Sequence, residues 1–435
     1  MTREHNWADN YTFSATRIHR PASVDEVRRL VAGSSRVRAI GARHSFNGIA
    51  DSAGDLIDLG GIDPGFLIDA RRGTVTVGGG TNYGVLAAHL HRAGWALHNM
   101  ASLPHVSIAG AIATGTHGSG DRLGNLSTAV AALDIVCATG DLVTIRRGDP
   151  NFDGAVVALG ALGIVTRVTL DIQPTFEMQQ DAFEGLPWST VLSDFDAVMS
   201  AGYSVSLMTS WSEPTVTRLW IKMQLGRGVE RATSMADLGA APAAHPSARP
   251  TPEAIARLNP FGAPGPWSER LPHFRPNAEL WPPGHLQSEY MVPRAQATAA
   301  IAKLRTIGER IDRHLWTTEI RSMAADRLWL SPAYGDDCVA IHFSWQRVLE
   351  AVEAMTAEIE TMPLPFGGRP HWGKIMHARS EQLAPLCPKL PEFRELAQSY
   401  DPGREFRNKL YGFARVRVRR HWRYPAPGNP CSRMC

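Results

Sequence analysis

Gly41-Ala42-Arg43-His44-Ser45-Phe46-Asn47-Gly48 forms a glycine-bracketed motif early in the chain. The run before it, Val37-Arg38-Ala39-Ile40, predicts a strand that leads into a sharp turn. In such a turn, glycine lets backbone N–H groups approach an anion closely, and serine and asparagine add short donors. His44 is a nucleophile as well as a donor, so it is a candidate covalent tether for whatever the turn binds. Taken alone, the motif is also compatible with a plain loop that exposes a histidine to solvent.

A second stretch of small residues, 109–120, reads Ala-Gly-Ala-Ile-Ala-Thr-Gly-Thr-His-Gly-Ser-Gly. Its backbone can lie against a flat, extended ligand, and its N–H and O–H groups can meet a pyrophosphate. A flexible linker is the alternative, but it would expose Ile108 and Ile112, and strand-forming sequence follows at once. The earlier Gly78-Gly79-Gly80 lacks the G-x-G-x-x-G spacing and the acidic residue of a nicotinamide-binding domain. A Rossmann domain is therefore not expected.

The composition indicates a globular protein without nucleic-acid, membrane or metal partners. The 435 residues carry a net charge of +3 and are 44% hydrophobic, which allows two domains with buried cores. No basic stripe with interleaved aromatic residues precedes residue 415, and no apolar run suits a signal peptide or a membrane span. The five cysteines are scattered, which suits a reducing compartment. We expect a cytoplasmic monomer.

A change in composition from Gln173-Pro174 onward divides the chain near residue 172. Before this point short strands alternate with helices, the first of which is opened by a capping box of Ser23 and Glu26. After it, tryptophan and polar strands replace the glycine-rich turns, and we expect a mostly antiparallel sheet. The predicted strands are 203–211, 217–225, 287–292, 317–322 and 339–345, the predicted helices are 294–313 and 349–361, and 232–266 is expected to be a long surface excursion.

Two of these strands each have a polar and an apolar face. Alternation places Glu319 and Arg321 on one side of their strand, and His342 and Ser344 on one side of another. The simplest interpretation is a sheet with one wet face and one core face. Polar faces of this kind also suit a site that recognises hydroxyl groups.

The segments 41–48, 109–120 and 160–166 together resemble the FAD-binding domain of the vanillyl-alcohol oxidase family. Further motifs match this family in order, from about residue 5 to about residue 408: Ala101-Ser102-Leu103-Pro104-His105, Gly115–Gly120, Leu286-Gln287-Ser288-Glu289-Tyr290, Glu319-Ile320-Arg321 and His371-Trp372-Gly373-Lys374. The resemblance implies an α+β fold with a PCMH-type FAD-binding domain at 1–172, a substrate domain at 173–375 and a return to the first domain at 376–412. The Arg- and Pro-rich tail, 413–435, departs from the family and is expected to be disordered.

The resemblance also implies the cofactor and the residues that bind it. FAD would be held covalently through His44 at its 8α-methyl carbon. Ser102 and Ser107 are expected at the isoalloxazine or ribityl chain, and Ile164 at the adenine. The full set implied for the cofactor is Gly41, Arg43, His44, Ser45, Ala101, Ser102, Ser107, Gly110, Thr114, Gly115, Thr116, His117, Ile164 and His371, with the residues from Gly110 to His117 on the pyrophosphate side.

The implied reaction is oxidation of the terminal primary alcohol of an alditol such as xylitol or sorbitol. Hydride passes to flavin N5, and O2 reoxidises the flavin to give H2O2. Such a reaction requires a base near the hydroxyl, and Lys374 is our candidate, with Arg321 lowering its pKa and stabilising the developing alkoxide. A small residue at Ala101 would leave oxygen a path to the flavin. The residues implied for substrate binding are Ser102, Glu319, Arg321, His342, Ser344 and Lys374.

Two other functions remain open from the sequence. Aldonolactone oxidases and dehydrogenases share the His-Ser turn and a similar His-Trp-x-Lys segment, and a dehydrogenase would use an acceptor other than oxygen. A non-enzymatic sugar- or flavin-binding protein would need the small-residue stretch but no base.

Overall fold

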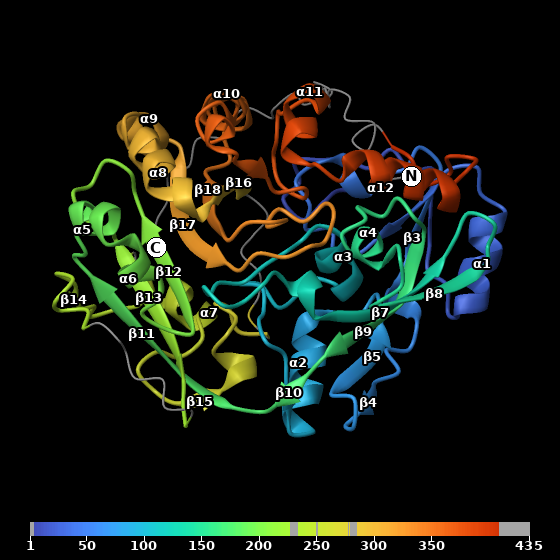
Figure 1. The fold of residues 1–435 in the computed structure, drawn as a ribbon, viewed down its shortest axis with the longest axis horizontal. Helices are drawn as coiled ribbons and strands as arrows, with labels where there is room; N and C mark the ends of the chain where they lie inside the picture. Colours follow the sequence, from blue (N-terminus) through green and yellow to red (C-terminus); the bar gives the residue numbers. More distant parts are fainter. Residues whose placement is uncertain (1–3, 227–233, 249–250, 277, 279–284, 409–435) are drawn as a thin grey trace, which may run out of the picture.

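The computed structural model describes residues 4–226, 234–248, 251–276, 278 and 285–408 (Figure 1). The predicted tail, 413–435, and the end of the predicted return to the first domain lie outside the described residues. Figure 1 shows two halves side by side, with the glycine-rich first half coloured blue to green and the large second sheet green to orange. The α+β fold class predicted from the sequence is confirmed.

The first half contains two small sheets and the helices that pack on them. A parallel sheet has the order β1-β3-β2, and an antiparallel sheet has the order β4-β5-β9-β7-β8. The strands of these sheets and of the short pair β6–β10 are β1 (Arg17–His19), β2 (Val37–Ile40), β3 (Asp55–Asp58), β4 (Leu67–Asp69), β5 (Thr74–Gly78), β6 (Trp95–Ala96), β7 (Val130–Val136), β8 (Leu142–Arg146), β9 (Ile164–Asp171) and β10 (Gln173–Pro174). The helices are α1 (Val24–Ala32), α2 (Tyr83–Arg92), α3 (Ile108–Ala113) and α4 (Phe152–Val156).

Helix α1 begins where the capping box predicts. Ser23 Oγ accepts a hydrogen bond from the Glu26 N–H at 3.3 Å, and the Glu26 carboxylate accepts one from the Ala22 N–H at 2.9 Å. Helical spacing then buries Val27 and Val31. The helix packs against the parallel sheet, and strand β2 of that sheet leads directly into the His44 turn.

The second half is built on a nine-stranded sheet with the order β14-β11-β13-β12-β17-β18-β16-β19, to which β15 adds beside β11. Its strands are β11 (Glu177–Glu184), β12 (Ser204–Thr209), β13 (Arg218–Gln224), β14 (Ala241–Pro242), β15 (Gly265–Pro266), β16 (Leu286–Pro293), β17 (Leu315–Met323), β18 (Cys338–Trp345) and β19 (Arg369–Pro370). One face packs beneath α5 (Trp188–Ser193), α6 (Phe195–Met199), α8 (Ala297–Arg305), α9 (Gly308–Asp312) and α10 (Leu349–Glu360). The opposite face of the central strands is therefore left for a site.

Three details differ from the sequence-based expectations. The predicted helix at 294–313 is two helices, α8 and α9, separated at Thr306 and Ile307; the first residue of α9, Gly308, packs so close to the Trp211 main chain that a Cβ there would lie 2.7 Å from its carbonyl oxygen. Strand β11 was not predicted. The described part of 232–266 is not only a surface excursion, because it adds β14 and β15 to the sheet and buries Asn259, next to α7 (Pro252–Arg257).

The last helices pack against the first half. Helix α11 (Ser380–Leu383) buries Leu383, and helix α12 (Leu390–Tyr400) buries Leu390 and Phe393, in the core that α2 and β5 form. Since β9 ends at Asp171 in one sheet and β11 begins at Glu177 in the other, we propose that the domain boundary lies between them, near residue 172.

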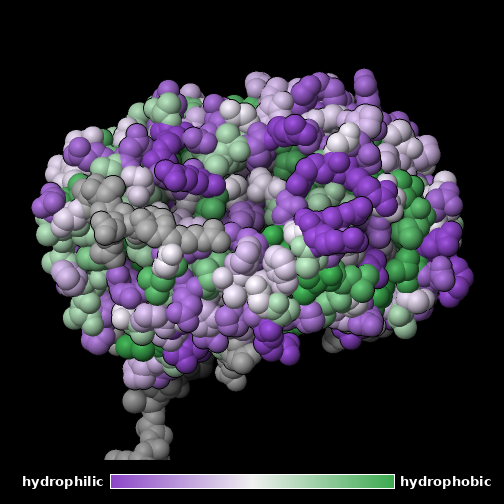
Figure 2. All heavy atoms as spheres, turned by 60° about the horizontal axis from the view of Figure 1, so that its bottom comes forward, coloured by the Kyte–Doolittle hydropathy of each residue, from purple (hydrophilic) through white to green (hydrophobic). Residues whose placement is uncertain are grey.

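The surface mixes hydrophilic and hydrophobic residues over the face shown in Figure 2. The large hydrophobic side chains that are exposed come from different parts of the fold: Leu67, Val85, Leu142, Ile255, Trp316 and Val348. None of the described helices combines the length and apolarity needed to cross a membrane.

Candidate active site

One cavity of about 1150 Å³ lies between the two halves of the molecule. The His44 turn and the 101–116 region line it from the first half, and the polar face of β16, β17 and β18 lines it from the second. The cavity-lining residues that the sequence analysis named are Gly41, Arg43, His44, Ser45, Ala101, Ser102, Ser107, Gly110, Thr114, Thr116, His117, Glu319, Arg321, His342, Ser344, His371 and Lys374. Most of the predicted site is thus brought together.

Two predicted cofactor residues lie outside the cavity lining. The side chain of Ile164 is fully buried in the core with Val136 and Phe406, because alternation along β9 turns its neighbour Val165 toward the cavity instead. Only the main chain of Ile164 is left for an adenine contact. Gly115 has a φ of 65° and packs against Pro332, so it shapes the turn between the two threonines that line the cavity.

The His44 turn is fastened to the segment that carries Lys374. The Asn47 side-chain amide donates to the carbonyl oxygens of Trp372 at 2.9 Å and Lys374 at 2.7 Å, and the Phe46 N–H donates to Gly373 at 2.8 Å. The candidate tether and the candidate base, more than 300 positions apart in sequence, are therefore fixed relative to each other.

His44 has the environment of a neutral nucleophile. Burial first, and then the positive charge of Lys374 and the proximity of His105, lower the pKa of His44 to about 3. Its ring lies 4.6 Å from the Trp7 ring, and Nε2 is buried with no hydrogen-bond partner among the described residues. His44 lines the cavity, and a ligand bonded to this unpartnered nitrogen would satisfy it.

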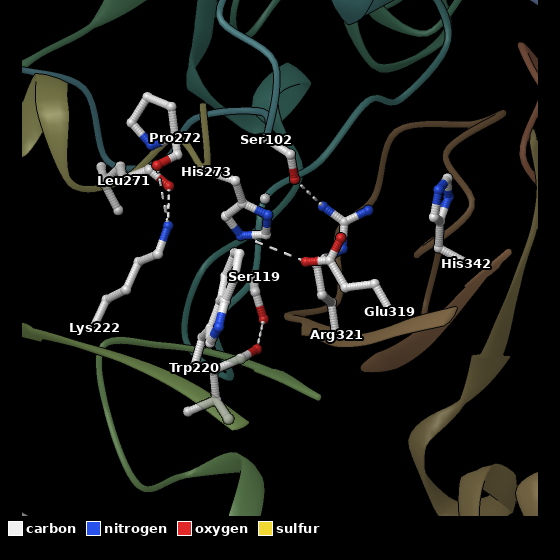
Figure 3. A network of polar contacts seen from close by, with 12 residues as sticks. Ser102, Ser119, Trp220, Lys222, Leu271, Pro272, His273, Glu319, Arg321 and His342 are labelled. Carbon is white, nitrogen blue, oxygen red and sulfur yellow. Dashed lines mark hydrogen bonds and ion pairs between the residues drawn. The ribbon is translucent and has the colours of Figure 1, made fainter. Parts of the chain in front are cut away.

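Arg321 is the centre of a buried charged cluster (Figure 3). Its guanidinium donates to Glu289 at 2.9 Å and to Ser102 Oγ at 3.1 Å, and its Nε lies 3.6 Å from Glu319. Burial alone would raise the pKa of Glu319, but Arg321, His273 and His342 outweigh it and lower that pKa to about 2. Both carboxylates are therefore ionised, and Arg321 is held by charge-assisted hydrogen bonds in one orientation.

Three histidines surround the same carboxylates. His117 Nε2 lies 3.1 Å and His342 Nδ1 3.6 Å from Glu289 Oε1, and His371 stacks obliquely on His117 with 6.3 Å between ring centroids. His117 therefore belongs to the charged cluster and not to the small-residue wall, where the sequence analysis placed it. The His117 side chain points away from the wall and contacts Glu289 on β16.

Lys374 lies at the edge of this cluster. Burial lowers its pKa to about 8, with Arg321 lowering it further and Glu289 opposing the shift. Its Nζ donates to the side chain of Gln287 and lies 5.1 Å from the centre of the Phe46 ring. A minor neutral fraction is therefore present at neutral pH, and in that form the amine can accept a proton.

Four functional candidates were missed by the sequence analysis. Gln287 and Glu289 alternate on one face of the Leu286–Tyr290 motif, so strand periodicity could have found them. His273 and Lys222 gave no comparable signal, because His273 reaches the cavity only through the packing of 251–274 over β13, and Lys222 on β13 contacts that segment at Leu271.

The cavity wall suits an extended, flat cofactor. Added Cβ atoms would lie 2.2 Å from Ser107 Oγ at Gly41 and 2.7 Å from it at Gly110, so a side chain at either position would displace the Ser107 hydroxyl where the His44 turn meets α3. With Ser107, Thr114 and Thr116, this wall offers backbone and hydroxyl donors opposite the charged cluster. The residues present therefore fit FAD, with the orphaned His44 nitrogen at one end of the wall.

Comparisons with known proteins agree with this geometry. A family model described as an FAD binding domain matches residues 15–146, and one described as D-arabinono-1,4-lactone oxidase matches residues 285–413. Alditol oxidase of a Streptomyces species is 43% identical over 410 residues, which cover 93% of this chain and 96% of that protein. L-gulono-1,4-lactone dehydrogenase of Mycobacterium tuberculosis is 29% identical over 425 residues, with the same two coverages.

Among solved structures, a cholesterol oxidase from B. sterolicum matches with a TM-score of 0.77 at 16% identity, covering 94% of this chain and 96% of that chain. At that identity the match supports the fold alone. The resemblance inferred from the motifs is confirmed by the family model and by the alignment over nearly the whole of both chains. The protein belongs to the vanillyl-alcohol oxidase family of FAD-binding proteins.

Proposed function

We propose that the protein is an FAD-dependent oxidase that converts the terminal primary alcohol of an alditol, such as xylitol or sorbitol, to the aldose, with O2 as acceptor and H2O2 as product. The observation that carries this proposal is the convergence of Lys374, Arg321 and Glu319 on the cavity that the His44 turn also lines. A base, a fixed cation and hydroxyl-binding groups are what oxidation of an unactivated polyol requires. The 43% identity to an alditol oxidase supports the same substrate class.

Each side chain of the cluster has a role in this reaction. Lys374 in its neutral form takes the hydroxyl proton at Nζ as the alcohol is oxidised. Arg321, held by Glu289 and Ser102, donates to the same oxygen as negative charge develops there. Glu319, His342 and Ser344 bind hydroxyl groups further along the chain. Bound FAD supplies the acceptor for the hydride.

The decisive experiment is anaerobic mixing of the purified holoprotein with alditols and aldonolactones. We expect xylitol and sorbitol to bleach the absorbance of the oxidised flavin, and glycerol to do so more slowly. Bleaching by aldonolactones alone would favour the function that the matched D-arabinono-1,4-lactone oxidase model describes. A flavin that no compound reduces would favour a binding protein and contradict the proposal.

Oxygen consumption separates an oxidase from a dehydrogenase. Ala101 lines the cavity next to Ser102, and its small side chain supports a path for O2 to the flavin. We expect oxygen uptake with sorbitol that matches the H2O2 formed. Reduction of a dye acceptor without oxygen uptake would identify a dehydrogenase.

We propose that FAD is attached covalently through His44. Replacing His44 with alanine should leave FAD bound by the remaining wall but make all of it extractable, because the neutral imidazole is the nucleophile on that side of the cavity. The measurement is flavin fluorescence on a denaturing gel. The exposed His245 provides the control, since His245→Ala should keep the fluorescent band. Wild-type protein that loses its yellow colour on denaturation would contradict the covalent bond.

Localisation and assembly also remain proposals. The three described cysteines, Cys137, Cys338 and Cys387, are buried and free, which is compatible with a cytoplasmic protein. We propose a monomer, and light scattering of the holoprotein would test this directly.

A further inference from the structure

Residues 6–11, here called the cap loop, pack against the His44 turn. Three main-chain carbonyl groups of the turn accept hydrogen bonds from this loop. The donor and acceptor pairs are the Trp7 N–H with Arg43 at 2.8 Å, Asn6 Nδ2 with Ser45 at 2.9 Å and Asn10 Nδ2 with Phe46 at 2.9 Å. The cap loop therefore fixes the backbone on both sides of His44.

The cap loop has anchors that do not involve the Trp7 ring. Asn6 is 5% exposed, and its side-chain oxygen accepts two main-chain N–H groups of the same loop. Ala8 is 0% exposed and lies in the core of the second half. The Asp9 carboxylate accepts a hydrogen bond from Arg347 at 2.7 Å. These contacts account for the docking of the loop without the Trp7 indole.

The Trp7 ring contacts the candidate nucleophile. It lines the cavity, and its centroid lies 4.6 Å from that of the His44 ring with 35° between the ring planes. The Phe46 ring is edge-on to both, with centroids 6.4 Å from Trp7 and 6.1 Å from His44. The imidazole thus packs against two aromatic rings that restrict the rotamers open to it.

The backbone next to His44 is strained. Arg43, directly before it, has a φ of 58°, a left-handed conformation that residues with a side chain rarely adopt. Such a conformation persists where surrounding contacts hold it, and the Trp7 N–H supplies one of them at the Arg43 carbonyl oxygen. Strain of this kind clusters at ligand and active sites, which indicates that the orientation of His44 is functionally constrained.

We propose that Trp7 is a positioning residue for the covalent attachment of FAD, which holds the His44 imidazole in the orientation from which a ring nitrogen bonds the 8α carbon. The inference rests on the covalent bond proposed above. As the N–C bond forms, the imidazole loses its N–H hydrogen and the 8α-methyl group loses one hydrogen. The two protons and two electrons released leave the flavin reduced, and O2 then accepts them to give H2O2.

The direction of the imidazole is the variable that this step leaves to be fixed. Burial, followed by Lys374 and His105, lowers the pKa of His44 to about 3, so the lone pair of the neutral ring is available. A displacement of about 1 Å of a reacting group can slow a reaction about 100-fold. A ring packed on the imidazole therefore has a large expected effect on the rate of attachment.

A pair of substitutions at Trp7 in the full-length chain tests the proposal. Trp7→Phe keeps an aromatic ring beside the imidazole, whereas Trp7→Leu keeps apolar bulk without a ring face. Both variants should purify with as much total FAD as the wild type, measured by flavin absorbance after denaturation. The covalent fraction, measured by flavin fluorescence on a denaturing gel, should be retained by Trp7→Phe and fall in Trp7→Leu. During incubation with FAD in air, Trp7→Leu should convert to the covalent form at least about tenfold more slowly than Trp7→Phe.

Two further variants make the test specific. Trp95, half-buried on β6, provides the matched control, because Trp95→Leu makes the same change in the core of the first half and should keep the wild-type covalent fraction. Asn10→Ala removes the hydrogen bond to Phe46 and leaves the Trp7 side chain in place. It should lower the covalent fraction while FAD stays bound. If Trp7→Leu does not fold, an unchanged covalent fraction in Asn10→Ala overturns the proposal.

The outcomes separate this inference from the proposals on which it rests. If the wild-type chain releases all its flavin on denaturation, the covalent bond and this inference both fail, while anaerobic reduction by sorbitol still tests the oxidase independently. If the wild type keeps its flavin and Trp7→Leu keeps it equally, only the inference is overturned. Loss of total bound FAD in Trp7→Leu would show a merely structural role and would also overturn it. An equal loss of the covalent fraction in Trp7→Phe and Trp7→Leu would exclude the ring contact as the cause.

Discussion

Replacing Lys374 with alanine should leave FAD bound and slow anaerobic flavin reduction by sorbitol about a thousandfold, which is within the range that a general base contributes. The amine of Lys374 lies at the edge of the charged cluster around Arg321. Its lowered pKa of about 8 keeps a neutral fraction of the amine available at neutral pH. Its Nζ is positioned by Gln287 on β16 and by the ring of Phe46 in the His44 turn. Stopped-flow measurement of the flavin absorbance isolates this step from reoxidation.

The pH dependence of the same step provides a second check. Because the neutral amine is the active form, the wild-type rate should rise with pH and level off above about 8, following the pKa of Lys374. Lys374→Ala should lose this rise, while Lys303→Ala on the exposed face of α8 should retain it. An alanine variant that reduces its flavin at the wild-type rate would remove Lys374 from the mechanism.

Replacing Arg321 with methionine should both abolish most turnover and destabilise the fold. The substitution takes from the carboxylate of Glu289, which is 1% exposed, its guanidinium partner at 2.9 Å and leaves it only the contacts with His117 and His342. Breaking a buried ion pair in this way costs about 3–5 kcal/mol. Loss of the cation next to the substrate oxygen should separately lower the rate of flavin reduction by about 100-fold.

A double variant separates the two effects of Arg321. Arg321→Met with Glu289→Gln also removes the carboxylate that has lost its guanidinium partner, so the unfolding midpoint in denaturant should recover at least half of the loss, whereas flavin reduction should stay slow. The single variant Glu289→Gln is the control, because it measures how loss of the Glu289 charge alone changes the unfolding midpoint and the rate of flavin reduction. Recovery of activity in the double variant would show that Arg321 acts only through the stability of the cluster.

Several parts of the fold and site were predictable because they depend on local patterns. The capping box placed the start of α1, and period-two alternation placed Glu319 with Arg321 and His342 with Ser344 on one face of the sheet. The same rule applied to Leu286–Tyr290 would have added Gln287 and Glu289. Such signals persist because a strand alternates its side chains whatever it packs against.

Other features had no local signal. The close approach of the Trp211 main chain to Gly308 in α9 depends on tertiary packing, and the place of His117 in the charged cluster follows from its contact with Glu289 on β16. The positions of Lys222 and His273 depend on how the 251–274 segment folds over β13. Each of these depends on residues far apart in the chain.

By itself, the sequence determined the glycine-bracketed His44 turn, the wall of small residues and the polar strand faces, since these follow from backbone sterics and side-chain periodicity. The tertiary structure alone decided that Asn47 joins that turn to the Lys374 segment and that Arg321 meets Ser102 and Glu289. It also decided the protonation of the site, because the pKa values of His44 and Lys374 are lowered chiefly by burial, and burial exists only once the two halves enclose the cavity.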